Sequence, residues 1–125
     1  MKKKILIVDE EQALVSALVD RFMKEGFITI SAANGKDGLE LALKDHPDII
    51  LLDIMMPVMD GATMLKKLRA DEWGKDVHVI LLTNLTGTKK LDESMHQGAC
   101  DYLVKCDMTI EDVVNKVKDK LKLAQ

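Results

Sequence analysis

Ile49-Ile50-Leu51-Leu52-Asp53 is a run of four apolar residues that ends in a carboxylate. A strand with one face in water alternates apolar and polar residues, whereas this run is apolar at every position before Asp53. Continuous apolar runs are typical of strands in a parallel sheet that helices cover on both faces. The stretch therefore predicts a buried strand with an acidic residue at its carboxyl end.

Four more short runs predict the other strands of this sheet. Residues 5–8 are also continuously apolar, residues 77–82 are apolar except at His78, and residues 102–104 form a shorter run. Residues 27–31 are more polar, which suits a strand at the edge of the sheet. The chain therefore predicts five strands.

Helical periodicity fills the intervals between these runs, because apolar residues recur there every three or four positions. The segments are the stripe of Leu14, Leu18 and Phe22, then residues 35–45, 61–71, 87–97 and 110–121. The segment 87–97 has few apolar residues and predicts the weakest helix. Residues typical of helix ends agree with these limits: Gly26 and Gly98 at C-termini, Asp60 as an N-cap, and Thr109 with Asp112 as an approximate capping box.

Strict alternation of five strands with five helices predicts an α/β fold with a parallel sheet and right-handed crossovers. Such a (βα)5 chain belongs to the doubly wound, flavodoxin-like class, for which we expect the strand order 2-1-3-4-5. Neither repeats nor a linker rich in Pro, Gly or Ser divides the 125 residues. We therefore expect residues 1–125 to form a single domain.

Composition narrows the class of protein further. Hydrophobic residues make up 47% of the chain and charged residues 31%, which is typical of a folded globular domain. The net charge of −3 argues against direct nucleic-acid binding, because a phosphate backbone attracts a positive excess.

Residues 5–8 are too few for a signal peptide or a membrane span, so we expect a cytoplasmic protein without membrane contact. Cys100 and Cys106 are interpreted as reduced thiols, not as a disulfide framework.

Polar residues follow the predicted strands at the edge where an open α/β sheet binds ligands. They are Asp9-Glu10-Glu11, Asp53, Thr83 and Lys105. Because the first and third strands are expected to be neighbours, Asp9, Glu10 and Asp53 would converge. Carboxylates this close repel one another unless protons or a cation neutralise them, and Mg²⁺ favours a few carboxylates with waters and phosphate oxygens.

This set of residue types is suited to phosphoryl transfer onto an aspartate. Asp53 supplies a nucleophile, Lys105 a positive charge and Thr83 a hydroxyl donor. Each residue taken alone is more often a turn residue, a helix cap or a solvated side chain. Their occurrence at the ends of four separately predicted strands favours the phosphoryl-transfer interpretation.

Longer motifs around these residues resemble the response-regulator receiver domains of two-component signalling, particularly stand-alone chemotaxis-regulator-like ones. The motifs are KKILIVDEE at 3–11, LLDIMMPVMDG at 51–61, LLT at 81–83 and GACDYLVK at 98–105. They occur in the family's order and cover essentially the whole chain. The resemblance implies that Asp53 is the phosphoacceptor, and that Asp9, Glu10, Asp53 and the Met55 backbone carbonyl hold Mg²⁺.

The same resemblance implies a switch that works through partners and catalyses only its own phosphotransfer and self-dephosphorylation, so we expect no separate enzyme activity. Thr83 would bond to the phosphoryl group, Lys105 would pair with it, and Tyr102 would turn inward as Thr83 moves. A sensor histidine kinase or histidine phosphotransfer protein would be the donor. The fourth helix, fifth strand and fifth helix would then bind a downstream protein target, a fused effector or a second copy of the chain.

Several positions depart from the family pattern. Glu10 stands where Asp is more frequent, Asn84 where a small residue is usual, and Cys106 where Pro commonly follows the lysine. Met55 and Leu85 are apolar at the two variable positions beside the site, and we expect slow self-dephosphorylation because neither orients an attacking water.

Other functions are open at this point. One is a phosphorylation-independent pseudo-receiver that serves only as an interaction module. An aspartyl phosphatase is a weaker alternative, because Met55 occupies the position of the second carboxylate that such enzymes need. Flavin binding is weaker still, since no phosphate-binding loop follows the first predicted strand.

Overall fold

Five parallel strands form one sheet in the order β2-β1-β3-β4-β5, as predicted. The structure is a computed structural model that describes residues 2–84, 89–99 and 101–123. Its elements are β1 (Lys4–Val8), α1 (Gln12–Lys24), β2 (Ile28–Ala32), α2 (Gly35–Asp45), β3 (Ile49–Asp53), α3 (Gly61–Arg69), β4 (His78–Thr83), α4 (Lys89–His96), β5 (Asp101–Val104) and α5 (Ile110–Lys120). The alternation of strands and helices is therefore confirmed, and the most polar of the predicted strands lies at an edge.

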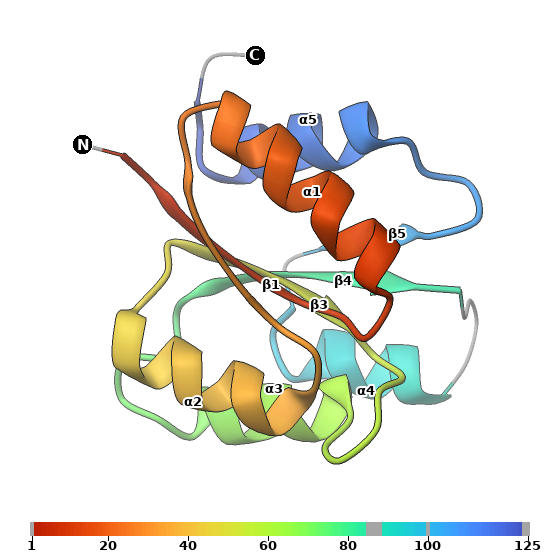
Figure 1. Ribbon diagram of the computed structural model, residues 1–125. Coiled ribbons are helices and arrows are strands. Elements are labelled where there is room, and N and C mark those ends of the chain that lie inside the picture. Colours follow the sequence, from red (N-terminus) through yellow and green to blue (C-terminus); the bar gives the residue numbers. More distant parts are fainter. Residues whose placement is uncertain (1, 85–88, 100, 124–125) are drawn as a thin grey trace.

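Helices cover both faces of the sheet. Figure 1 shows α1 and α5 on one face and α2, α3 and α4 on the other. Alternate residues of β3 serve the two layers: Ile49 and Leu51 pack toward α1 and α5, whereas Ile50 and Leu52 pack toward the opposite helices. All four are fully buried. A strand that must be apolar on both faces has no polar position, which is why this run is continuous.

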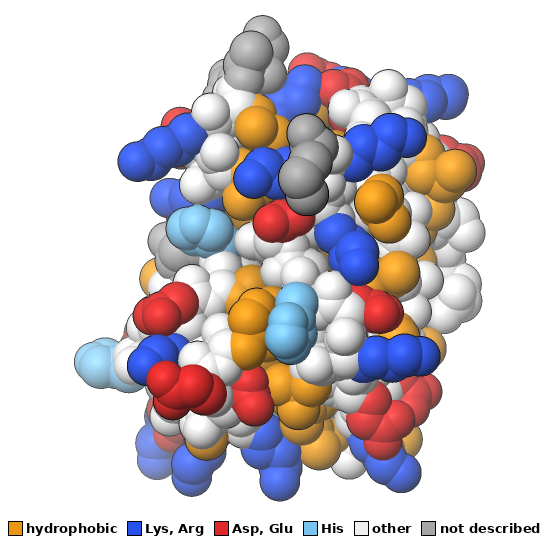
Figure 2. Space-filling view, turned by 90° about the vertical axis from the view of Figure 1, so that its left-hand side faces the viewer, with side chains coloured by type: hydrophobic (Ala, Val, Ile, Leu, Met, Phe, Trp, Pro, Cys, Tyr) orange, Lys and Arg blue, Asp and Glu red, His pale blue; other side chains and the backbone are white. Residues whose placement is uncertain are grey.

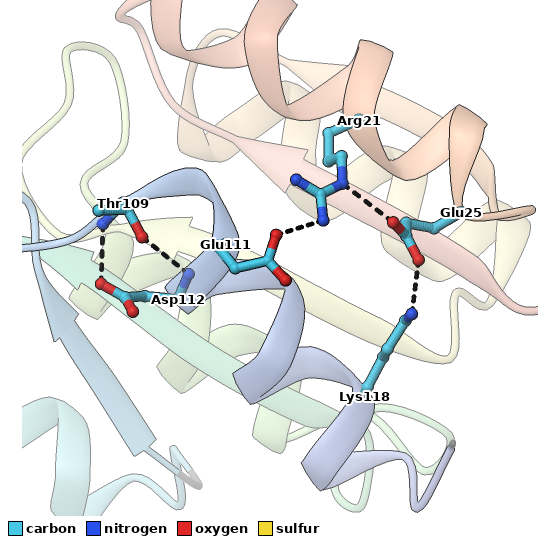
Figure 3. Close-up of polar contacts among 6 residues, drawn as sticks. All are labelled: Arg21, Glu25, Thr109, Glu111, Asp112 and Lys118. Atoms are coloured by element: carbon cyan, nitrogen blue, oxygen red, sulfur yellow. Dashed lines mark hydrogen bonds and ion pairs between the residues drawn. The ribbon is translucent and has the colours of Figure 1, made fainter. Parts of the chain in front are cut away.

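Local signals at the helix ends are confirmed. Asp60 Oδ1 accepts a hydrogen bond from Thr63 N at 2.8 Å at the start of α3. Thr109 and Asp112 form a reciprocal capping box at the start of α5 (Figure 3). Gly26 and Gly98 have φ values of 92° and 93°, a region that L residues avoid.

Several boundaries differ from those predicted, most of them by a single residue. β2 begins at Ile28 because the Phe27 N–H donates to the Phe22 carbonyl at 2.9 Å and not to β1. The two rings also meet edge-on, with centroids 5.1 Å apart. The backbone of Phe27 thus belongs to the turn after α1. α3 ends at Arg69, before residue 71, and α4 is described only from Lys89 onward. Residues 87 and 88 of that predicted helix, together with Leu85 and Cys100, lie outside the described residues.

Ion pairs connect α1 to α5. Arg21 Nε lies 2.9 Å from Glu25 Oε2, and the same guanidinium also contacts Glu111. The other oxygen of Glu25 contacts Lys118 Nζ. Figure 3 shows this alternating chain of charges, the α1–α5 charge network, running between the two helices. The network adds a polar connection to the apolar contacts beneath it.

The surface mixes charges of both signs. Figure 2 shows the left-hand side of Figure 1, where basic and acidic side chains intermingle around apolar ones. Among its described side chains, this face therefore offers no continuous basic track of the kind that nucleic-acid backbones bind.

No helix within residues 2–84, 89–99 and 101–123 has the length and apolar character needed to cross a bilayer.

Candidate functional site

The carboxyl ends of β1, β3, β4 and β5 surround a cavity of about 400 Å³. Its lining residues are Asp9, Glu10, Glu11, Asp53, Met55, Thr83, Asn84 and Lys105. Strand register explains the convergence, since Asp53 pairs with Leu82 on β4, and Thr83 pairs with Val104 on β5. Six residues singled out from the sequence thus line one cavity. Tyr102 does not line it and belongs to a separate groove beside α5.

Asp53 is the buried last residue of β3. The residue is only 6% exposed, and its Oδ1 accepts a hydrogen bond from Met55 N at 3.2 Å. The start of α3 lies directly against this strand end, where a Cβ on Gly61 would approach the Asp53 carbonyl oxygen to 2.2 Å. Only glycine permits that approach, so the Asp-Gly step at 60–61 positions the loop that carries Met55.

Lys105 lies among three carboxylates. Its Nζ is 2.6 Å from Asp9 Oδ2, 3.3 Å from Asp53 Oδ2 and 3.7 Å from Glu11 Oε1. Its backbone N–H donates to the Thr83 carbonyl at 2.8 Å, which fixes the end of β5 against β4. With only 11% of its side chain exposed, this ammonium is the counter-charge of a largely buried acidic pocket.

Burial and charge shift the ionisation of the two central residues. Burial raises the pKa of Asp53 from 3.8 to about 6, and the negative charge of Asp9 also raises it. The charge of Lys105 and the hydrogen bond from the Met55 amide lower this pKa, but by less. Burial lowers the pKa of Lys105, but the hydrogen bond to Asp9 and the charges of Asp53 and Asp9 outweigh it, so that pKa is raised overall. The pocket therefore holds excess negative charge that one lysine only partly neutralises.

Asp9 provides the structural reason to expect a cation here. The residue is completely buried, and its Oδ1 accepts a hydrogen bond from Glu11 N at 2.9 Å. Its Oδ2 is buried, and among the described residues the structure pairs it only with the Lys105 ammonium, at 2.6 Å. A buried carboxylate oxygen of this kind, beside the carboxylate of Asp53, fits a hard cation such as Mg²⁺.

Glu10 is placed differently from the two buried aspartates. It lines the cavity, but it is exposed to solvent. Within the described part of the chain, no three Asp, Glu, His or Cys side chains are arranged to hold a metal by themselves. Mg²⁺ commonly takes one or two carboxylates and completes its shell with waters and phosphate oxygens, so the present donors fit it without such a cage.

Two cavity residues, Glu11 and Asn84, were not assigned a site role from the sequence. Glu11 stands in the acidic triplet that follows the first strand, and that triplet was the available signal. Met55, whose backbone carbonyl is the predicted Mg²⁺ ligand, is 50% exposed at the cavity. Cys106 is exposed, and the peptide bond that joins it to Lys105 is trans, since no cis bond occurs among the described residues.

Comparison with known proteins identifies the class of this site. The sequence model of the family described as response regulator receiver domain matches residues 5–118. This chain belongs to the response regulator receiver domain family. Receiver domains are signalling switches of two-component systems and act with histidine kinases or phosphotransfer proteins and with downstream effectors. The family binds Mg²⁺ in the active site.

Individual relatives differ in length. The response regulator PleD from Caulobacter vibrioides is 39% identical over 114 residues, which span 91% of this chain and only 24% of PleD. Sporulation initiation phosphotransferase F from Bacillus subtilis is 35% identical over 98% of this chain and 97% of its own length. The CheX-CheY-BeF3-Mg²⁺ complex from Borrelia burgdorferi contains a chain 31% identical with a TM-score of 0.84, over 95% of this receiver domain and 89% of that chain.

Proposed function

We propose that Asp53 accepts a phosphoryl group from a histidine kinase or histidine phosphotransfer protein and that this modification changes which partner the receiver domain binds. The supporting observation is the ion-pair geometry of the cavity, in which Lys105 Nζ bridges the buried carboxylates of Asp9 and Asp53. A buried acceptor carboxylate beside a fixed ammonium is suited to phosphoryl transfer, which depends mainly on positioning and charge stabilisation.

The transfer exchanges one bond to phosphorus for another. An oxygen of the Asp53 carboxylate forms a bond to phosphorus while the bond between phosphorus and the donor's imidazole nitrogen breaks. The electron pair of that bond stays on the nitrogen, which takes up a proton. Lys105 and the Thr83 hydroxyl then stabilise the added oxygens, because both are donors at the rim of the same cavity.

Mg²⁺ is the cofactor that this proposal requires. Asp9, Asp53 and the Met55 carbonyl would hold it, with Glu10 reaching it directly or through a water. When bound, the ion neutralises charge on the phosphoryl oxygens. The Borrelia burgdorferi relative, whose complex contains Mg²⁺ and BeF3, supports this assignment.

The output of the switch would come from α4, β5 and α5. Tyr102 on β5 is 38% exposed and next to Asp101, whose Oδ2 pairs with Lys116 and Lys120 on α5. Movement of Thr83 toward a phosphoryl group would let Tyr102 turn inward and alter this face. A downstream protein, a fused effector or a second copy of the chain would bind there.

Self-dephosphorylation is proposed to be slow. Met55 exposes 50% of its apolar side chain at the cavity and has no group that orients an attacking water. Leu85, the other apolar position assigned from the sequence, lies outside the described residues.

Intact mass tests the proposed function directly. The purified chain is incubated with acetyl phosphate, with and without Mg²⁺, beside Asp53→Asn as the matched variant. We expect a phosphoryl adduct on the wild type only in the presence of Mg²⁺, and slow decay of that adduct. Absence of an adduct under every condition would contradict the proposal and favour the pseudo-receiver, whose partners bind without phosphorylation.

A further inference from the structure

Glu11 precedes α1 at its N-cap position, but its side chain does not cap the helix. The N-caps described for α2, α3 and α5 are Asn34, Asp60 and Thr109, and each accepts a hydrogen bond from the backbone of its own first turn. The Glu11 side chain accepts none there. Its Oε1 instead lies 3.7 Å from Lys105 Nζ, across the mouth of the cavity.

The three carboxylates that share Lys105 differ in their freedom to leave it. The side chains of Asp9 and Asp53 are 0% and 9% exposed, so losing the ammonium would leave a buried charge without compensation. The Glu11 side chain is 60% exposed, so water can replace the ammonium around its carboxylate. Glu11 is therefore the partner that separates from Lys105 at the lowest cost.

We propose that Glu11 regulates phosphorylation as a displaceable counter-charge on Lys105, an inference that rests on the proposed function of Asp53. In the unphosphorylated protein, Glu11 holds part of the ammonium's charge at the mouth of the cavity. Incoming phosphoryl oxygens must take that charge over, and Glu11 moves into solvent when they do. The residue therefore lowers the rate at which an anionic phosphodonor reacts with Asp53.

Two substitutions separate the contact with Lys105 from the charge of Glu11. Glu11→Gln removes the charge. Glu11→Asp keeps the charge but shortens the side chain by one methylene, so its carboxylate no longer reaches Lys105. Glu72→Gln removes an exposed carboxylate that pairs with Lys75 outside the cavity, and it serves as the control for loss of a surface charge.

The rate of adduct formation with acetyl phosphate at saturating Mg²⁺ is the first measurement. In this reaction Asp53 takes the phosphoryl group, and acetate leaves with the electrons of the broken phosphorus–oxygen bond. We expect Glu11→Gln and Glu11→Asp both to react about two- to fivefold faster than the wild type, the range that a weak exposed ion pair allows. Glu72→Gln should react at the wild-type rate.

The mobility of the Lys105 ammonium is a second measurement that does not depend on phosphorylation. Relaxation of its ¹⁵Nζ signal should report greater motion in both Glu11 variants than in the wild type or in Glu72→Gln. Equal rates and equal mobility in all four proteins would overturn the inference while leaving the function of Asp53 intact. A Glu11→Asp variant that behaves like the wild type would also overturn it, since charge alone would then explain the effect. A wild type that forms no adduct would overturn both proposals.

Discussion

Asp53 is a carboxylate in a position that disfavours its charge. Burial and the charge of Asp9 raise its pKa to about 6, although Lys105 lies 3.3 Å away. The native protein therefore holds an ionised Asp53 near neutral pH at a cost that the unfolded chain does not bear. Such a conflict between stability and local chemistry is typical of functional sites.

Asp53→Asn should stabilise the protein in a pH-dependent way. Because the folded pKa lies above the unfolded value of 3.8, the wild type loses stability as the pH rises from about 4 to about 6. The variant avoids this loss, so we expect its free energy of unfolding to exceed that of the wild type by up to about 3 kcal/mol at pH 7.5. Urea unfolding at pH 4 and pH 7.5 measures the difference, which should be small at pH 4. Equal differences at both pH values would contradict the assignment.

Val58 occupies a backbone conformation that suits a different residue. Its φ is 69°, in the left-handed region, and its side chain is 78% exposed. A β-branched residue is strained there, and so exposed a side chain recovers little through packing. We expect Val58→Asn to raise the free energy of unfolding by about 1 kcal/mol, because asparagine tolerates this region. Val58→Ile is the matched control and should leave the strain in place; thermal unfolding that ranks asparagine at or below valine would refute the argument.

At the scale of elements, the α1–α5 charge network should contribute a small, salt-dependent share of stability. Hydrogen bonds from Lys118 and then from Arg21 lower the pKa of Glu25. The contribution of Glu25 is therefore present above the unfolded pKa, near 4.5, and disappears as the pH falls through the lower folded value.

We expect Glu25→Gln to lower the midpoint of urea unfolding at pH 7 in low salt. The decrease should be smaller in 1 M NaCl than in low salt, and smaller still in acid. Surface ion pairs are screened by salt, which gives the reason for the second comparison. Glu40→Gln on α2 is the control for removal of an exposed carboxylate. A Glu25→Gln effect that is independent of salt would show that packing, not charge, accounts for it.

Element boundaries show what local pattern predicts and where packing intervenes. The limits 35–45 predicted for α2 are those of the structure, because Asn34 caps its start and Ala42 faces the core within a regular stripe. β2 is shifted by one residue because the backbone N–H of Phe27 bonds to the Phe22 carbonyl at the end of α1. Periodicity identifies an apolar residue as buried, but only the neighbouring helix decides whether its backbone joins the sheet.

At the scale of the whole molecule, the cavity is assembled from four strand ends that are distant in sequence. A cation that binds this assembled site and not the unfolded chain must stabilise the fold. We expect MgCl₂ to raise the thermal unfolding midpoint, with a gain of about 2.7 kcal/mol at a hundredfold excess over Kd. NaCl at equal ionic strength should not reproduce this rise, and Asp9→Asn should abolish it. An equal response of wild type and Asp9→Asn to MgCl₂ would place the ion elsewhere.

The sequence by itself determined the order of elements and the residue types at the strand ends. Continuous apolar runs, helical stripes and capping residues act over a few positions, so they can be read from neighbouring residues. Those same patterns predicted that Asp9, Asp53, Thr83 and Lys105 end four strands, and sheet topology then requires them to lie near one another.

Only the tertiary structure decided how these side chains share their charges. Glu10 and Glu11 are adjacent acidic residues, and the sequence predicts a site role for Glu10 only, yet it is Glu11 whose carboxylate lies 3.7 Å from Lys105. The direction of a side chain just beyond a strand depends on the turn into the next helix, here fixed by the hydrogen bond from Glu11 N to Asp9. Its partner Lys105 directly follows β5 and is far from Glu11 in the sequence, so no local pattern encodes the contact.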